Sequence, residues 1–142
     1  AHLGFRHSSD EYKVMALASY GRPTALPALR ELVRATGDGG FAVEPIDWAA
    51  LGAGDADLAA SAQARLEEVL LDLAAWLHRE SGEEDLAMAG GVALNCVANS
   101  RVAREGPFAR VWVQPAAGDA GTALGAALHV AREAGDRIAP MR

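Results

Sequence analysis

Two short glycine-containing stretches carry the residue types best suited to holding a phosphate. The first contains Gly90 and Gly91, and the second contains Gly118, Asp119 and Gly121. Each follows an apolar run and opens a helical one, which places unpaired backbone N–H groups at the positive end of a helix dipole. A glycine also simply permits a tight turn, so either stretch alone is a weak signal. Two such stretches at the same end of adjacent parallel strands predict one ligand-binding crevice.

The surrounding residues exclude two common phosphate motifs and leave the role of Asp119 open. No Gly-Lys-Ser/Thr follows either stretch, so neither is a Walker A loop, and the second lacks the glycine spacing of a dinucleotide-binding fingerprint. The carboxylate of Asp119 can coordinate a divalent cation, or it can cap the helix that follows. On chemistry alone we favour the cap.

Two further polar groups offer ligand contacts. Asn95 and Asn99 are four residues apart, on one helical face that can contact a base or ribose or can simply face solvent. Glu11, Tyr12 and Lys13 place a carboxylate, a phenol and an ammonium within one helical turn. That grouping suits contacts to ribose and phosphate, but it is also common on a solvated surface.

The remaining residues with distinctive chemistry favour structural roles. No pair at the helical spacing of metal ligands occurs among His2, His7, His78 and His129. Cys96 lies on the apolar side of its predicted helix, so we expect it to be buried and inert. Core anchoring is the expected role of Trp48, Trp76 and Trp112.

Hydrophobic spacing and glycine stops predict the elements of the N-terminal part. We expect a short helix after an N-cap at Ser9, a second amphipathic helix over 26–35 and a short strand over 41–43. The segment 44–55 is rich in turn residues and forms the least regular part. A break in architecture is expected near Gly54.

The C-terminal part has the clearest pattern. A long helix is predicted over 57–80, with an apolar face that includes Leu66, Val69, Leu70 and Leu73 and with Arg65 off that face. Strand, glycine turn and helix then follow twice, with strands over 85–89 and 110–114 and helices over 92–104 and 120–134. Two successive strand–helix units imply a parallel pair of strands, and the predicted fold class is therefore α/β.

Composition excludes several classes of function. The chain has 142 residues and a formal net charge of −6 at pH 7. Because no Lys/Arg cluster occurs, a nucleic-acid-binding surface is disfavoured. The apolar runs are too short to cross a membrane. A single cysteine forbids an internal disulfide, which is typical of a cytoplasmic protein.

Three stretches together resemble one protein family. They are residues 9–21 (SDEYKVMALASYG), 90–99 (GGVALNCVAN) and 111–127 (VWVQPAAGDAGTALGAA). In this order they are similar to the O-carbamoyltransferases of nodulation-factor and antibiotic biosynthesis. The resemblance implies an actin-like (ribonuclease-H-like) ATPase fold, related to the tRNA threonylcarbamoyl transferase, with the nucleotide between two subdomains.

The resemblance also implies a reaction and its cofactors. A carbamoyl group passes from carbamoyl phosphate, through a carbamoyl adenylate made from ATP, to a hydroxyl of a small-molecule natural product or oligosaccharide. By resemblance, Gly90, Gly91 and Asn95 match the glycine-turn motif beside the nucleotide. Glu11 and Lys13 match an acidic-basic helix that faces ribose and phosphate, and Lys13 is the candidate catalytic residue for the adenylate's developing charge.

For the second stretch, the resemblance makes Gly118 and Gly121 nucleotide-binding candidates and raises Asp119 from cap to ligand of a divalent metal, iron or magnesium. Relatives carry an upstream subdomain with a phosphate loop and paired histidines, and a C-terminal domain that makes the carbamoyl adenylate. We expect both to be absent here, so that 1–142 is a partial carbamoyltransferase domain, inactive alone, with a helix-and-loop segment (1–54) and a nucleotide-facing α/β core (55–142).

Two other functions stay open at this point. One is a threonylcarbamoyl-transferase-like ATPase that acts on tRNA, which the acidic charge disfavours. The other is a non-catalytic α/β module that binds a partner, in which case substitution of Asp119 would leave function unchanged. The carbamoyltransferase interpretation predicts that activity requires the missing segments of the parent chain.

Overall fold

A computed structural model describes residues 2–6 and 9–139 as a mixed α/β structure that is about half helical and has two small sheets. The elements in chain order are α1 (Glu11–Ala18), α2 (Leu26–Leu32), β1 (Val33–Ala35), β2 (Phe41–Val43), α3 (Asp55–Ser81), β3 (Asp85–Met88), the 3₁₀ helix η1 (Gly91–Leu94), α4 (Cys96–Glu105), β4 (Arg110–Val113) and α5 (Ala120–Glu133). None of the helices in these ranges is long and apolar enough to cross a membrane.

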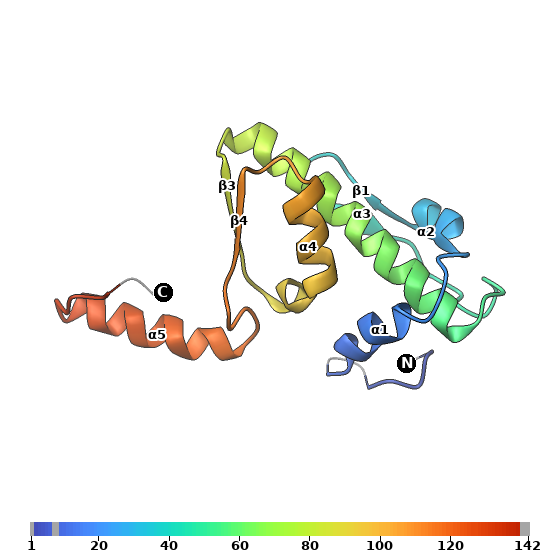
Figure 1. Cartoon of the computed structure of the whole chain (residues 1–142), viewed down its shortest axis with the longest axis horizontal. Coiled ribbons are helices and arrows are strands. Elements are labelled where there is room, and N and C mark those ends of the chain that lie inside the picture. Colours follow the sequence, from blue (N-terminus) through green and yellow to red (C-terminus); the bar gives the residue numbers. More distant parts are fainter. Residues whose placement is uncertain (1, 7–8, 140–142) are drawn as a thin grey trace.

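The 27-residue helix α3 runs through the middle of the molecule, with the N-terminal elements along one part of it and α4 beside it (Figure 1). It begins after Gly54, with Asp55 and Asp57 in its first turn, where carboxylates favour the positive end of the dipole. It ends at Gly82, whose left-handed backbone (φ 68°) lets its N–H donate to the carbonyl of His78. The predicted helix is confirmed and starts two residues earlier than expected.

Polar contacts attach the N-terminal elements to the start of α3. The carboxylate of Asp57 accepts a hydrogen bond from the backbone N–H of Arg22 (2.8 Å), and the hydroxyl of Ser61 accepts one from Ala25 (3.0 Å). Ser61 is completely buried, and its hydroxyl in turn donates to the carbonyl of Asp57 (2.6 Å). These bonds satisfy backbone donors in the connection between α1 and α2.

The predicted N-cap of the first helix at Ser9 is wrong. The residue that precedes α1 is Asp10, and its carboxylate accepts hydrogen bonds from the Arg6 N–H (3.0 Å) and from the hydroxyl of Ser9 (3.3 Å). The Asp10 side chain thus folds back onto the preceding loop. The Ser9 hydroxyl donates to this carboxylate and does not cap the helix.

The second helix is shorter than predicted, because Val33 to Ala35 form β1 and not its last turn. β1 pairs antiparallel with β2, with Val33 opposite Val43 and Ala35 opposite Phe41. The helical spacing of the leucines continues to Val33, but ladder bonds to a neighbouring strand outweigh that local preference. The predicted strand over 41–43 is confirmed.

Arg65 lies inside the structure, although its predicted place was off the apolar face. It is only 9% exposed, and its Nε donates to the carbonyl of Val33 (2.6 Å) while Nη1 pairs with Glu68 (2.7 Å). Arg30 of α2 forms a second ion pair with Glu68. One carboxylate and two guanidinium groups therefore fasten α2 and β1 to α3, and the charge is tolerated because it is paired.

The predicted parallel pair of strands is confirmed, with Leu86 of β3 opposite Val111 of β4. One face of this sheet packs on α3 and α4 around a core of Ala74, Val102 and Phe108. The other face is open, and Trp112 on it is 50% exposed. Trp112 is therefore not the core anchor that was expected, because within residues 2–6 and 9–139 helices pack on only one face of the sheet.

The final two helices differ in how they are packed. The predicted helix over 92–104 is divided into η1 and α4, which begins after Asn95, and Cys96 is exposed and not buried as predicted. The predicted helix over 120–134 is confirmed as α5, but no residue of it is buried, and it stands apart from the other elements (Figure 1). Its leucines Leu124 and Leu128 are only partly buried, and neither belongs to the core around Val102 in the described part of the chain.

The Glu68 cluster predicts a specific acid sensitivity. Hydrogen bonds from two guanidinium groups lower the pKa of Glu68 from 4.5 to about 2, and the bond from Arg30 has a larger effect than the bond from Arg65. A depressed folded-state pKa adds stability that is complete above pH 4.5 and is lost as pH falls from 4.5 toward 2. We expect Glu68→Gln to lower the free energy of unfolding by about 2 kcal/mol at pH 7, with the difference from wild type vanishing near pH 2.

Urea unfolding followed by circular dichroism between pH 2 and pH 7 measures this difference. Glu44→Gln is the matched control, because the ion pair of Glu44 with Arg34 is exposed at both ends and should contribute less than about 0.5 kcal/mol. A Glu68→Gln protein whose stability parallels wild type at every pH would contradict the role given to the cluster.

Candidate functional site

The two glycine stretches lie side by side, as the sequence predicts. They follow the carboxyl ends of the parallel strands β3 and β4, and the backbone N–H of Gly90 donates to the carbonyl of Ala117 across the gap (2.7 Å). A Cβ on Gly118 would stand 3.1 Å from Leu94 of η1, so the second stretch also packs on the first. This edge of a parallel sheet is where ligands bind in open α/β folds.

The glycines of the first stretch are not explained by crowding within the chain. Gly90 has φ 103°, a backbone conformation that side chains rarely adopt, so a glycine is required there. A Cβ on either Gly90 or Gly91 would meet nothing within 4 Å. The space over this turn is therefore open for the close approach of another group.

The second stretch is partly explained by its own packing. A Cβ on Gly121 would lie 2.2 Å from the carbonyl oxygen of Ala116, so the tight turn into α5 demands glycine at this position. Asp119 precedes α5, but its side chain caps no N–H in the part of the chain that the structure describes. The cap that chemistry alone favoured is thus wrong, and the carboxylate is exposed and available.

Asn95 is held in place by a partner that sequence analysis missed. Its Oδ1 accepts from the N–H of Ala98 and so caps α4 (3.0 Å), and it also accepts from Nε2 of Gln63 on α3 (3.2 Å). Its Nδ2 donates to Oε1 of Gln63 (2.8 Å). Gln63 therefore fixes the start of α4 beside the glycine stretches, and a lone glutamine in a long helix gives no sequence signal of such a pairing.

Asn99 does not lie simply on a solvated face. Its Nδ2 donates to the carbonyl of Ala93 (2.8 Å), which directs the other end of the amide inward. Among the described residues nothing bonds to its buried Oδ1. A buried acceptor without a donor costs free energy, so this oxygen is an unsatisfied polar group beside the start of α4.

Glu11 and Lys13 lie on α1, which packs against α3. The ammonium of Lys13 pairs with Asp10 (3.0 Å) and stands 5.7 Å from the centre of the Tyr12 ring. The hydrogen bond to Asp10 raises the pKa of Lys13, so the side chain remains protonated and positively charged at neutral pH. No hydrogen bond or ion pair joins the described part of α1 to either glycine stretch.

The described residues do not form a complete metal centre. No group of three or more His, Cys, Asp or Glu side chains converges within 2–6 and 9–139. Asp119 offers one carboxylate, whereas a protein-bound divalent cation usually takes several protein or water ligands.

Comparison with known proteins places this arrangement in a family. The model of the family described as carbamoyltransferase N-terminus matches residues 41–128, which include both strands and both glycine stretches. The chain belongs to this carbamoyltransferase family. The match begins at β2, continues through α3, β3, η1, α4 and β4, and ends within α5.

Curated relatives agree with that assignment. An uncharacterized protein of Synechocystis is 39% identical over 91% of this chain and 25% of its own length. Nodulation protein NolNO of Sinorhizobium fredii is 38% identical over 89% of the chain and 21% of its own length. Nodulation protein NolO of Bradyrhizobium diazoefficiens is 38% identical over 92% of the chain and 26% of its own length. The chain thus spans about a quarter of the length of these relatives.

The amide pair predicts how Asn95 supports the site. Asn95→Ala removes the cap of α4 and both bonds to Gln63, and we expect it to lower the free energy of unfolding by about 1–2 kcal/mol. Asn95→Asp keeps the capping oxygen and should cost less than the alanine variant. Arg104→Gln is the control on the same helix, because the Arg104 side chain is exposed and its replacement should leave the stability nearly unchanged. Urea unfolding that gives equal stabilities for Asn95→Ala and wild type would contradict this role.

Proposed function

We propose that this chain is the nucleotide-facing part of an ATP-dependent O-carbamoyltransferase. The observation that carries the proposal is the pair of glycine stretches joined by the Gly90–Ala117 hydrogen bond, within the region that matches the family. The proposed reaction transfers a carbamoyl group, by way of a carbamoyl adenylate, to a hydroxyl of a small-molecule natural product or oligosaccharide. Carbamoyl phosphate is the proposed donor.

The proposed place of the chain in the whole enzyme is the second half of an actin-like ATPase domain, with residues 1–54 as a helix-and-loop segment and 55–142 as the core. The open face of the β3–β4 sheet and the unburied helix α5 support this. Both are surfaces that a larger domain would cover. The remaining segments of the parent enzyme are therefore proposed partners, and transfer activity would require them.

Backbone groups carry most of the proposed nucleotide contact. The open space over Gly90 and Gly91 suits phosphate oxygens, and so does the start of α5, where Gly118 precedes the helix and Gly121 lies in its first turn, because helix N-termini present unpaired N–H groups. Asn95 would act by holding this edge in place through Gln63.

Glu11 and Lys13 are proposed to face the ribose and phosphate of the bound nucleotide. Lys13 already has a carboxylate partner in Asp10, so a phosphate must compete with that pair or share the ammonium. The ammonium can donate three hydrogen bonds, which permits sharing. Its proposed catalytic role is to stabilise negative charge on the adenylate phosphate as that group leaves.

A divalent metal ion would fit this chain only if further ligands completed its coordination beside Asp119. Asp119 would supply one oxygen, and the remaining protein ligands would come from outside the described residues. When bound, such an ion would neutralise charge on phosphate oxygens. In the transfer itself the oxygen of the acceptor hydroxyl bonds to the carbamoyl carbon and gives up its proton to water, the bond from that carbon to the phosphate oxygen breaks, and AMP departs. This chain's part is to bind and orient the departing phosphate.

Calorimetric titration with a non-hydrolysable ATP analogue and Mg²⁺ tests the proposal. We expect metal-dependent binding by the chain joined to the flanking segments of its parent enzyme, and loss of the metal-dependent part in Asp119→Ala. Asp136→Ala, beyond the far end of the same helix, is the control and should bind as wild type does. Absence of binding by the complete polypeptide would overturn the nucleotide site and favour the partner-binding module.

A further inference from the structure

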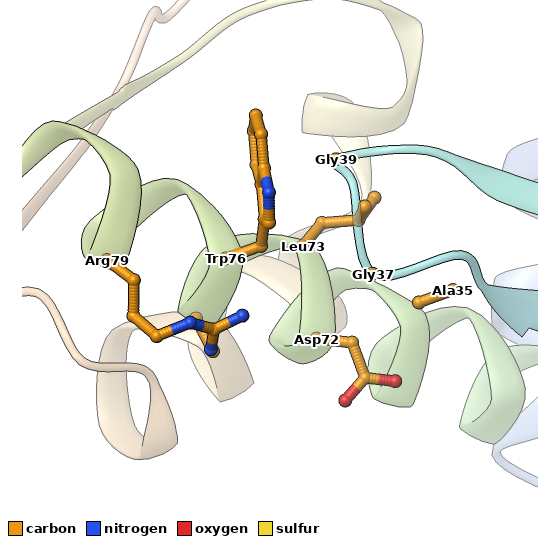
Figure 2. Close-up of a pocket in the computed structure, with 8 residues that line it drawn as sticks. Ala35, Gly37, Gly39, Asp72, Leu73, Trp76 and Arg79 are labelled. Atoms are coloured by element: carbon orange, nitrogen blue, oxygen red, sulfur yellow. The ribbon is translucent and has the colours of Figure 1, made fainter.

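The antiparallel strands β1 and β2 are joined by a turn over residues 36–40, which is called the hairpin turn here. A cavity of about 270 Å³ lies between this turn and the C-terminal half of α3, remote from the glycine stretches. One wall is formed by Ala35 of β1 and by the backbone of Gly37 and Gly39 in the turn. The other wall is formed by α3 residues Asp72, Leu73, Ala75, Trp76 and Arg79. Figure 2 shows the two walls facing each other, with the turn beside the helix.

Three side chains of α3 bring different chemistry to this cavity. Asp72, Trp76 and Arg79 are spaced by four and three residues, so they share one face of the helix. The Trp76 ring stands between α3 and the turn at Gly39, and the Arg79 guanidinium extends along the helix toward Asp72 (Figure 2). Neither charged group forms an ion pair or hydrogen bond with another described residue, so both keep their bonding capacity.

The turn holds the Trp76 ring in position. Gly39 has φ 87°, and a Cβ there would lie 2.6 Å from Cη2 of Trp76. The end of the indole therefore packs directly on the backbone of the turn, which only a glycine allows. A ring that is already fixed loses little conformational freedom when a ligand stacks on it.

These features together favour a small, uncharged ligand with hydroxyl groups. The carboxylate of Asp72 accepts hydrogen bonds, the guanidinium of Arg79 donates them, and the indole offers an apolar face. The two charges are opposite in sign, so the lining as a whole favours neither an anion nor a cation. The volume is just below the range of about 300–1,000 Å³ for drug-sized ligands, which suits one small ring and not a nucleotide.

We propose that this cavity binds one sugar unit of a carbohydrate. The C–H face of the sugar stacks on Trp76, one hydroxyl donates to Asp72, and another accepts from Arg79. Gln63, beside the glycine stretches, precedes Trp76 by 13 residues, which is about 20 Å along a helix. The sugar unit held here is therefore distant from the proposed site of transfer, and its binding goes beyond the proposed function and needs no nucleotide.

Titration of the ¹⁵N-labelled chain with cellotriose and maltotriose, followed by amide and indole NMR signals, tests this inference. We expect saturable shifts, in the millimolar range of sugar, of the Trp76 indole N–H and of the amides of Gly37 and Gly39. The indole of Trp112, which is 50% exposed on the open sheet, is the internal control and should not shift. Phenylalanine variants at each tryptophan assign the indole signals.

Asp72→Asn and Arg79→Gln decide the outcome, because both side chains are exposed and their loss should leave the fold intact. Each should weaken sugar binding about tenfold. Arg104→Gln, an exposed arginine on α4, should leave binding unchanged. The inference is overturned if neither sugar shifts the Trp76 indole signal, or if the Trp112 indole signal shifts equally. It is also overturned if both variants bind sugar as wild type does, or if the same signals respond more strongly to glycine or inorganic phosphate than to sugar. None of these outcomes involves the ATP site.

Discussion

The packing of other elements along α3 is the constraint on which the rest of this structure depends. The hydroxyl of Ser61, near its start, accepts a hydrogen bond from the backbone N–H of Ala25 before α2, and the guanidinium of buried Arg65 donates one to the carbonyl of Val33 in β1. Gln63, between them on the helix, holds Asn95 at the start of α4. Near its other end, Trp76 packs on the hairpin turn. One long helix thereby sets the positions of elements that are far apart in the sequence.

This arrangement explains why the candidate site is rigid on one side and open on the other. The start of α4 is fixed through the amide pair, and the first glycine stretch is bonded to the second through Gly90 and Ala117. The opposite face of the sheet and the whole of α5 lack buried contacts within the described chain. A site preorganised by backbone donors, with its remaining walls supplied from elsewhere, fits a part of a larger transferase.

Strong local patterns made much of the fold predictable from the sequence. The hydrophobic spacing correctly predicted α3, α5, the strands β3 and β4 and their parallel pairing, whereas the helix predicted between those strands is divided into η1 and α4. Errors arose where tertiary contacts outweigh local preference: Val33 joins a strand, and Arg65 is buried because Glu68 neutralises it. Cys96 was predicted to be buried from its place on the apolar side of a helix, and Trp112 was predicted to be a core anchor, but both are exposed.

The candidate site was predictable only where glycine marks a turn. Gly90 and Gly118 identified the strand ends, whose adjacency follows from parallel pairing. Gln63 gave no signal, because the chemistry of its amide depends on a partner 32 residues away. Likewise, the cavity at Trp76 exists only because the hairpin turn folds onto α3.

The central claim is that nucleotide binds where the two glycine stretches meet. Hydrogen–deuterium exchange with and without an ATP analogue tests it most directly, in a longer polypeptide that joins this chain to flanking segments of a carbamoyltransferase relative. The account predicts slower exchange in peptides that cover residues 89–95 and 116–122, with the hairpin over 33–43 unchanged. Protection confined to other parts of the chain, or none at all when the polypeptide binds the analogue, would contradict it.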